Sequence, residues 1–143
     1  MDNKLLVRES KDLLALLRDE QKKAGYISEQ FIEGIAQSMA LSIGEVYGVA
    51  TFYHFLSNRP LGRNVIQVCK SIPCYLKSSQ LIVDTIQIEL GIRPGQTTAD
   101  GRFSLQLTNC IGACDQVPVM LLNNDLHGNL TPTKVLQILK ECP

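Results

Sequence analysis

The sequence predicts an α/β protein, with an N-terminal helical segment at residues 1–60 followed by an α/β domain at residues 61–143. Two observations carry this prediction. Apolar residues recur at helical spacing in the first part, whereas β-branched and alternating runs appear only in the second. The turn-like stretch Arg59-Pro60-Leu61-Gly62 separates the two patterns. At 143 residues and 45% apolar content, the chain is long enough to bury a core.

Three helices are expected in the first segment. The first covers residues 4–23, where leucines share one face among charged residues. Ser28 is placed to N-cap the second helix, whose apolar stripe follows directly. Ser42 and Glu45 form a capping-box pattern that starts the third helix, which runs into the aromatic cluster at residues 52–55.

Strands and helices alternate in the second segment. A β-α-β-β-α order suits a small sheet flanked by helices. The expected elements are a strand at 65–68, a helix at 77–90 closed by Gly91, strands at 103–108 and 119–122, a short strand around Leu126 and a helix after Thr131-Pro132.

Four cysteines stand in two close pairs, each after a strand-like run: Cys69 with Cys74, and Cys110 with Cys114. Soft thiolates held in loops suit an iron–sulfur cluster, and each pair can take one iron of a [2Fe–2S] unit. Gly112 can adopt a positive φ, which helps backbone N–H groups point toward sulfur. Structural zinc sites also use four cysteines at similar spacing, so the spacing alone leaves zinc open, along with unliganded or disulfide-bonded thiols.

Composition and missing motifs exclude several functions. Fourteen basic residues balance fourteen acidic ones, so there is no broad basic field to bind nucleic acid or an anionic membrane surface. No secretory signal or membrane-spanning stretch is visible, which predicts a soluble cytoplasmic protein whose cysteines are reduced. No Gly-x-Gly-x-x-Gly or phosphate loop is present, so the chain is not expected to hold NAD or flavin itself. Cys142 is expected to be a free thiol, and His54 a packing or surface residue.

Several ordered motifs together resemble a known family. They are the run Gly48–Phe55, the Cys69 and Cys74 pair, Cys110-Ile111-Gly112-Ala113-Cys114-Asp115 with Pro118, and the closing run Gly128–Pro132. In this order they resemble the thioredoxin-like [2Fe–2S] subunit family of NADH dehydrogenases. That family includes the small flavoprotein-partner subunit of respiratory complex I and the matching subunits of NAD-dependent hydrogenases, formate dehydrogenases and electron-bifurcating relatives. The resemblance runs from about Gly25 to Leu139.

The resemblance implies a thioredoxin-like fold for the second segment and one [2Fe–2S] cluster bound by Cys69, Cys74, Cys110 and Cys114. It implies a non-catalytic electron-relay subunit of an NAD(H)-linked multisubunit oxidoreductase. FMN and NAD(H) would bind a larger flavoprotein partner that works with further iron–sulfur subunits. The helices of residues 1–60 would then be the docking element, because an amphipathic helical segment of this length needs a surface to bury against. A zinc-stabilised adaptor and a free-standing thioredoxin-like ferredoxin stay open as alternatives.

Two segments beside the cysteines depart from the family's usual pattern. Residues 70–73 are bulkier than the small-residue loops common there, and residues 75–79 lack a Gly-Ala step. Both departures are expected to affect reduction potential, exposure or partner fit. An apolar shield around the cysteines is expected from Ile72, Pro73, Ile111, Val117 and Pro118.

Overall fold

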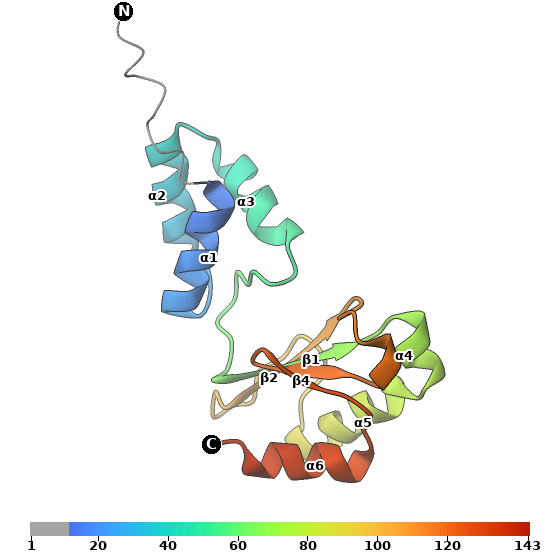
Figure 1. Ribbon diagram of the computed structural model, residues 1–143. Coiled ribbons are helices and arrows are strands. Elements are labelled where there is room, and N and C mark those ends of the chain that lie inside the picture. Colours follow the sequence, from blue (N-terminus) through green and yellow to red (C-terminus); the bar gives the residue numbers. More distant parts are fainter. Residues whose placement is uncertain (1–11) are drawn as a thin grey trace, which may run out of the picture. The chain divides into compact units, whose positions relative to one another are not determined.

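The computed structural model describes residues 12–143 (Figure 1). These residues divide into two compact units, with the boundary between Pro60 and Leu61. The helix expected at 4–23 lies partly outside the described residues, and its described part is α1, Leu13–Ala24. Within residues 12–143, every helix is too short or too polar to cross a membrane.

The first unit contains α1, α2 (Glu29–Met39) and α3 (Ile43–Phe52). The predicted caps are confirmed. Ser28 Oγ accepts the N–H of Phe31 at 3.2 Å, and the Ser42 and Glu45 side chains complete a reciprocal capping box. The helices pack around a small apolar core made of Leu17, Ile27, Ile32, Ile35, Ala36, Val46, Ala50 and Leu56.

The second unit is built on a mixed four-stranded sheet in the order β2-β1-β3-β4. Its strands are β1 (Asn64–Cys69), β2 (Phe103–Thr108), β3 (Met120–Leu122) and β4 (Asp125–His127). Strands β1 and β2 are parallel, whereas β3 pairs antiparallel with β1 and with β4. The α/β prediction is therefore confirmed, with each predicted strand present.

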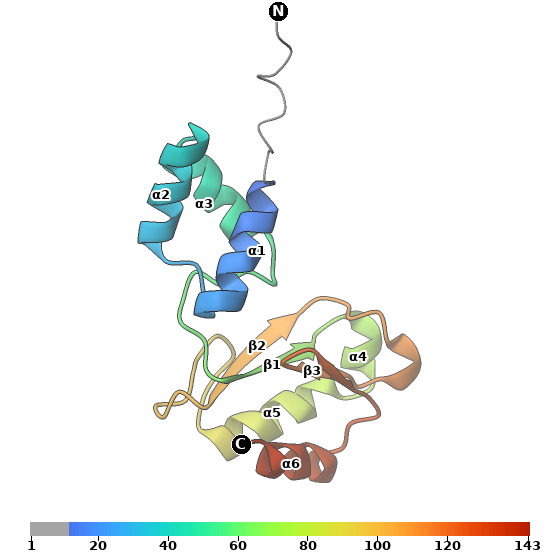
Figure 2. The same ribbon diagram turned by 60° about the vertical axis from the view of Figure 1, so that its left-hand side comes forward.

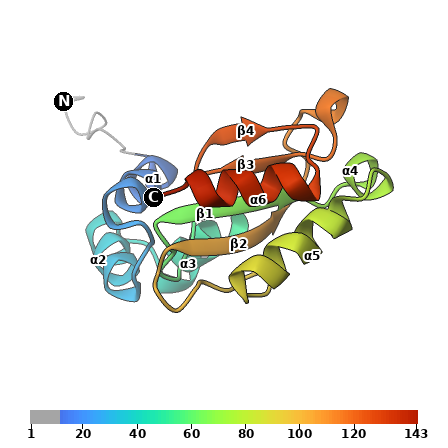
Figure 3. The same ribbon diagram turned by 90° about the horizontal axis from the view of Figure 1, so that it is seen from below.

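Two helices cover one face of this sheet, α5 (Ser79–Leu90) and α6 (Pro132–Glu141) (Figures 2 and 3). Helix α5 lies in the crossover that makes β1 and β2 parallel, as such a connection requires. Side chains from the helices and from the covered face of the sheet form the main core, which includes Ile66, Val68, Ile82, Ile86, Leu105, Met120, Val135 and Leu139.

The structure corrects the expectation that both cysteine pairs lie in plain loops. A one-turn helix, α4 (Ile72–Leu76), follows β1 and carries Cys74, and a 3₁₀ helix at Cys114–Gln116 begins with the last cysteine of the second pair. The physical reason for α4 is visible in its first residues. Ser71 is extended, and Pro73 stands in the first turn, where its missing N–H leaves no intrahelical bond unmade.

Candidate functional site

The sheet brings the two cysteine pairs to one edge. Cys69 is the last residue of β1 and lies opposite Thr108, the last residue of β2. Cys110 follows two residues later. Because β1 and β2 are parallel neighbours, their carboxyl ends meet at the same edge, and both pairs start there.

The two pairs differ in exposure. Cys69 and Cys74 are each 1% exposed and pack with Ala113 and Val119 in a small cluster of their own. Cys110 and Cys114 are exposed, with their Sγ atoms 3.8 Å apart. The site is therefore dry on the side of the first pair and open to solvent at the second.

The predicted apolar shield is only partly present. Ile111 and Val117 pack against the buried cysteines and their neighbours. Ile72 is 73% exposed, so the prediction is wrong for this residue. Ile72 begins the short helix α4, and its single turn leaves the side chains of Ile72, Tyr75 and Leu76 exposed to solvent.

A backbone N–H group points at one of the sulfur atoms. Gly112 has φ +86°, and its N–H donates to Cys110 Sγ at 3.3 Å, which confirms the prediction made for this glycine. Such a donor stabilises negative charge on sulfur.

The two buried cysteines, Cys69 and Cys74, have pKa values shifted in opposite directions. Burial raises the pKa of Cys74 to about 11, helped by its hydrogen bond to Cys69. The pKa of Cys69 lies below its ordinary value: burial opposes its ionisation, but the donors from Ser71, Cys74 and Ile111 outweigh it. At the exposed pair, the neighbouring Cys110 raises the pKa of Cys114. Since metal binding takes thiolates, loading this site would release protons.

A glycine remote in sequence supports the turn that carries Cys114. The N–H of Asn129 donates to the carbonyl of Gln116 at 2.6 Å. A Cβ added to Gly128 would lie 2.6 Å from Gln116 Cβ, so only glycine lets the two segments approach this closely. Gly128 belongs to the family motifs, but no role at the site was predicted for it. The Gly-Asn step before a helix start was the available signal.

The remaining candidates lie elsewhere. His54 is exposed in the first unit. Cys142 is half-buried against the main core of the sheet, and its carbonyl accepts a hydrogen bond from Arg102. Neither packs in the small buried group that contains Cys69 and Cys74.

The four thiols suit an iron–sulfur cluster. Two sulfurs bound to one tetrahedral metal at about 2.3 Å lie roughly 3.8 Å apart, which is the separation of the Cys110 and Cys114 sulfurs. A [2Fe–2S] unit needs two thiolates at each of two irons, which the two cysteine pairs can supply.

Comparisons with known proteins agree with this site. A family model described as thioredoxin-like [2Fe–2S] ferredoxin matches residues 3–143. A subunit of the NADH-quinone oxidoreductase of Pseudomonas aeruginosa is 40% identical over 124 residues, which cover 87% of this chain and 75% of that protein. The corresponding subunit from Escherichia coli strain K12 gives the same identity and coverage.

Among solved structures, an air-oxidized NAD+-reducing [NiFe]-hydrogenase contains a similar chain, with a TM-score of 0.75 and 24% sequence identity. The match covers 89% of this chain and 22% of the hydrogenase chain. It shows a shared fold.

Proposed function

This chain belongs to the thioredoxin-like [2Fe–2S] ferredoxin family, and from that premise we propose that it is an electron-transfer subunit of an NAD(H)-linked multisubunit flavoprotein oxidoreductase. We assign it one [2Fe–2S] cluster, held by Cys69, Cys74, Cys110 and Cys114. One observation carries the assignment: the carboxyl ends of the parallel strands β1 and β2 bring both cysteine pairs to one edge of the sheet.

When bound, such a cluster exchanges one electron at a time. The residues of this chain would hold it and set its potential. The N–H group of Gly112 points at Cys110 Sγ and favours the more negative, reduced state, while the exposed second pair leaves one side near solvent for a partner. The chain makes or breaks no substrate bond in this role.

The partner follows from what the sequence lacks. Because no nucleotide-binding motif is present, FMN and NAD(H) belong on a larger flavoprotein subunit in this proposal, with further iron–sulfur subunits beyond it. The relatives named as NADH-quinone oxidoreductase subunits support this assignment. The proposal includes a cytoplasmic location and no nucleic-acid partner.

The cofactor is tested on the chain purified without oxygen. We expect a brown protein with two iron and two sulfide per chain, bleached by dithionite, with an electron paramagnetic resonance (EPR) signal from the reduced cluster. A colourless protein with one zinc would contradict the proposal and support the zinc-stabilised adaptor.

The partner is tested by co-expression with the flavoprotein subunit of the same organism. We expect the two to co-purify, and NADH to reduce the cluster only when the flavoprotein is present. A chain that stays alone and is not reduced by this route would instead be the free-standing ferredoxin.

A further inference from the structure

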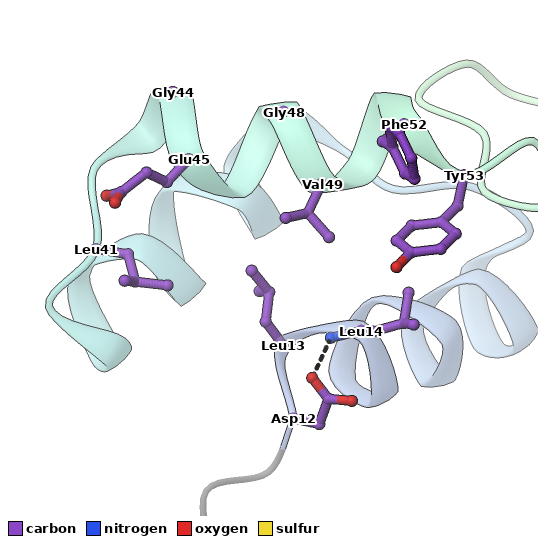
Figure 4. A pocket seen from close by; sticks show the side chains of 10 residues that line it. All are labelled: Asp12, Leu13, Leu14, Leu41, Gly44, Glu45, Gly48, Val49, Phe52 and Tyr53. Carbon is purple, nitrogen blue, oxygen red and sulfur yellow. Dashed lines mark hydrogen bonds between the residues drawn. The ribbon is translucent and has the colours of Figure 1, made fainter.

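An apolar groove of about 660 Å³ runs between the N-terminal turn of α1 and helix α3 (Figure 4). Leu13 and Leu14 form one side, and Val49, Phe52 and Tyr53 the other. All the residues that line the groove belong to the first unit, whereas the cysteines belong to the second.

The outer face of α3 beside the groove is unusually apolar for a solvent-exposed helix. Phe52 is 73% exposed and Tyr47 is 45% exposed, although both are large enough to dominate a contact surface. Phe52 also lines the groove, so its exposed ring adds to an apolar surface of the kind that marks interaction sites. We call this surface the α3 groove.

Two glycines on α3 point to a close approach by another backbone. Gly44 and Gly48 stand four residues apart, so they share one face of the helix, and both line the groove. A Cβ added at either would meet no atom within 4 Å. Glycine weakens a helix interior, where Gly48 lies, and no contact among the described residues requires glycine there. A second helix packed across this face of α3 would require small residues there, because its backbone would come close to that of α3.

The charges at the groove indicate what kind of helix fits. The two charged residues that line it, Asp12 and Glu45, are both acidic. A second copy of this surface in an isologous dimer would bring carboxylates into the same contact. A partner with basic residues near these positions would be complementary to them.

We propose that the α3 groove binds an amphipathic helix of the flavoprotein subunit. The apolar stripe of that helix packs against Phe52 and Val49, its backbone crosses Gly44 and Gly48, and at least one Lys or Arg lies beside Asp12 or Glu45. This inference rests on the proposed function for the identity of the partner. It deepens that function by narrowing the expected docking segment, residues 1–60, to one groove and by naming the chemistry of its partner.

The test compares Gly48→Leu with Gly34→Leu in the full chain carrying its cluster. Gly34 is a matched control, because it is also an exposed helical glycine with no atom within 4 Å of an added Cβ, but it lies on α2 outside the groove. Both variants should raise the melting temperature of the free chain, since leucine favours a helix over glycine. Affinity for the purified flavoprotein should fall about tenfold or more for Gly48→Leu and stay unchanged for Gly34→Leu.

A second pair of variants does not depend on added bulk. Phe52→Ala should weaken binding, whereas Ile88→Ala, which removes an 85% exposed side chain from α5, should not.

Each contrary result has a distinct meaning. If the wild-type chain binds the flavoprotein and Gly48→Leu binds equally well, the proposed function stands and the α3 groove is not the interface. If the wild-type chain does not bind, both the partner and this inference are wrong. A lower melting temperature for free Gly48→Leu would show that the groove is filled from within the chain itself. Loss of a wild-type self-association in Gly48→Leu would identify a second copy as the occupant. Either of these two results overturns the inference.

Discussion

The Sγ atoms of Cys110 and Cys114 lie 3.8 Å apart on an exposed turn, whereas the other two cysteines are almost fully buried. The exposed pair can therefore be altered without opening the core of the second unit. That separation makes it possible to distinguish loss of a ligand from loss of the fold.

Replacing Cys114 with serine should remove or strongly change the cluster. Serine offers a hard hydroxyl in place of a soft thiolate, while the exposed position leaves the packing intact. Iron content, the visible spectrum and EPR measure the effect, and circular dichroism checks the fold. Cys142→Ser is the control, because Cys142 packs against the main core, and its spectrum should match the wild type. An unchanged spectrum for Cys114→Ser would remove this residue from the ligand set.

Gly112→Ala should make the reduction potential more negative. At φ +86°, an alanine is strained by about 1–2 kcal/mol, and relief of that strain moves the N–H that donates to Cys110 Sγ. A donor weakened by roughly 1 kcal/mol corresponds to about 40 mV for one electron. An EPR-monitored redox titration measures the shift.

Gly95→Ala is the matched control for that measurement. Gly95 has φ +88° and, like Gly112, has no atom within 4 Å of an added Cβ, but it lies in the connection between α5 and β2. The two variants should lose similar stability, and only Gly112→Ala should shift the potential. Equal potentials for the wild type and Gly112→Ala would mean that this N–H does not influence the cluster.

Much of this site was predictable because its signals are local. A β-branched run that ends at Cys69 and an alternating run just before Cys110 predict two strand ends, and the structure has both. The positive φ at Gly112 and the capping box at Ser42 were also predictable, since each depends on a few neighbouring residues. Assigning the cofactor needed more, because spacing alone left zinc open.

What the sequence did not predict depends on contacts between distant segments or on short helices. Helix α4 has five residues, too few for a periodic pattern, so the exposure of Ile72 could not be foreseen. The close approach of Gly128 to Gln116 joins segments twelve residues apart, and the Gly-Asn step at residues 128–129 does not by itself reveal the partner segment. Both features lie beside the cysteines.

Removing the Glu45 carboxylate should destabilise α3 near neutral pH, with an effect that disappears in acid. The backbone N–H and hydroxyl of Ser42 donate to this carboxylate and hold the pKa of Glu45 below its ordinary value of 4.5. A lowered folded-state pKa contributes stability above the unfolded pKa, and the contribution is lost as pH falls through the folded value.

Hydrogen exchange of the α3 amides measures this effect locally. The wild type should exchange more slowly than Glu45→Gln at pH 6, and the ratio of their rates should approach one as the carboxylate protonates below pH 4.5. Ser42→Ala removes the hydroxyl that caps Glu45 N–H and should lower stability by about 1 kcal/mol. A ratio that does not change with pH would show that charge on Glu45 is irrelevant to the cap.

Gly128→Ala should disturb the cluster although residue 128 is not one of the proposed ligands. The added Cβ would lie 2.6 Å from Gln116 Cβ and 3.1 Å from its carbonyl oxygen, so the 3₁₀ turn that starts at Cys114 has to shift. Overpacking of this kind costs about 1–3 kcal/mol in the free energy of unfolding. The expected readouts are a lower melting temperature together with reduced iron content or an altered EPR signal.

Gly62→Ala separates that local effect from general destabilisation. A Cβ at Gly62 would lie 2.8 Å from the backbone of Phe103, so this variant is also overpacked, but at the end of the sheet where β1 and β2 begin. It should lower the melting temperature and leave the EPR signal of the folded protein unchanged. If both variants alter the signal equally, the cluster responds to overall stability. If only Gly128→Ala does, Gly128 is a positioning residue that acts through Gln116 on the turn of Cys114.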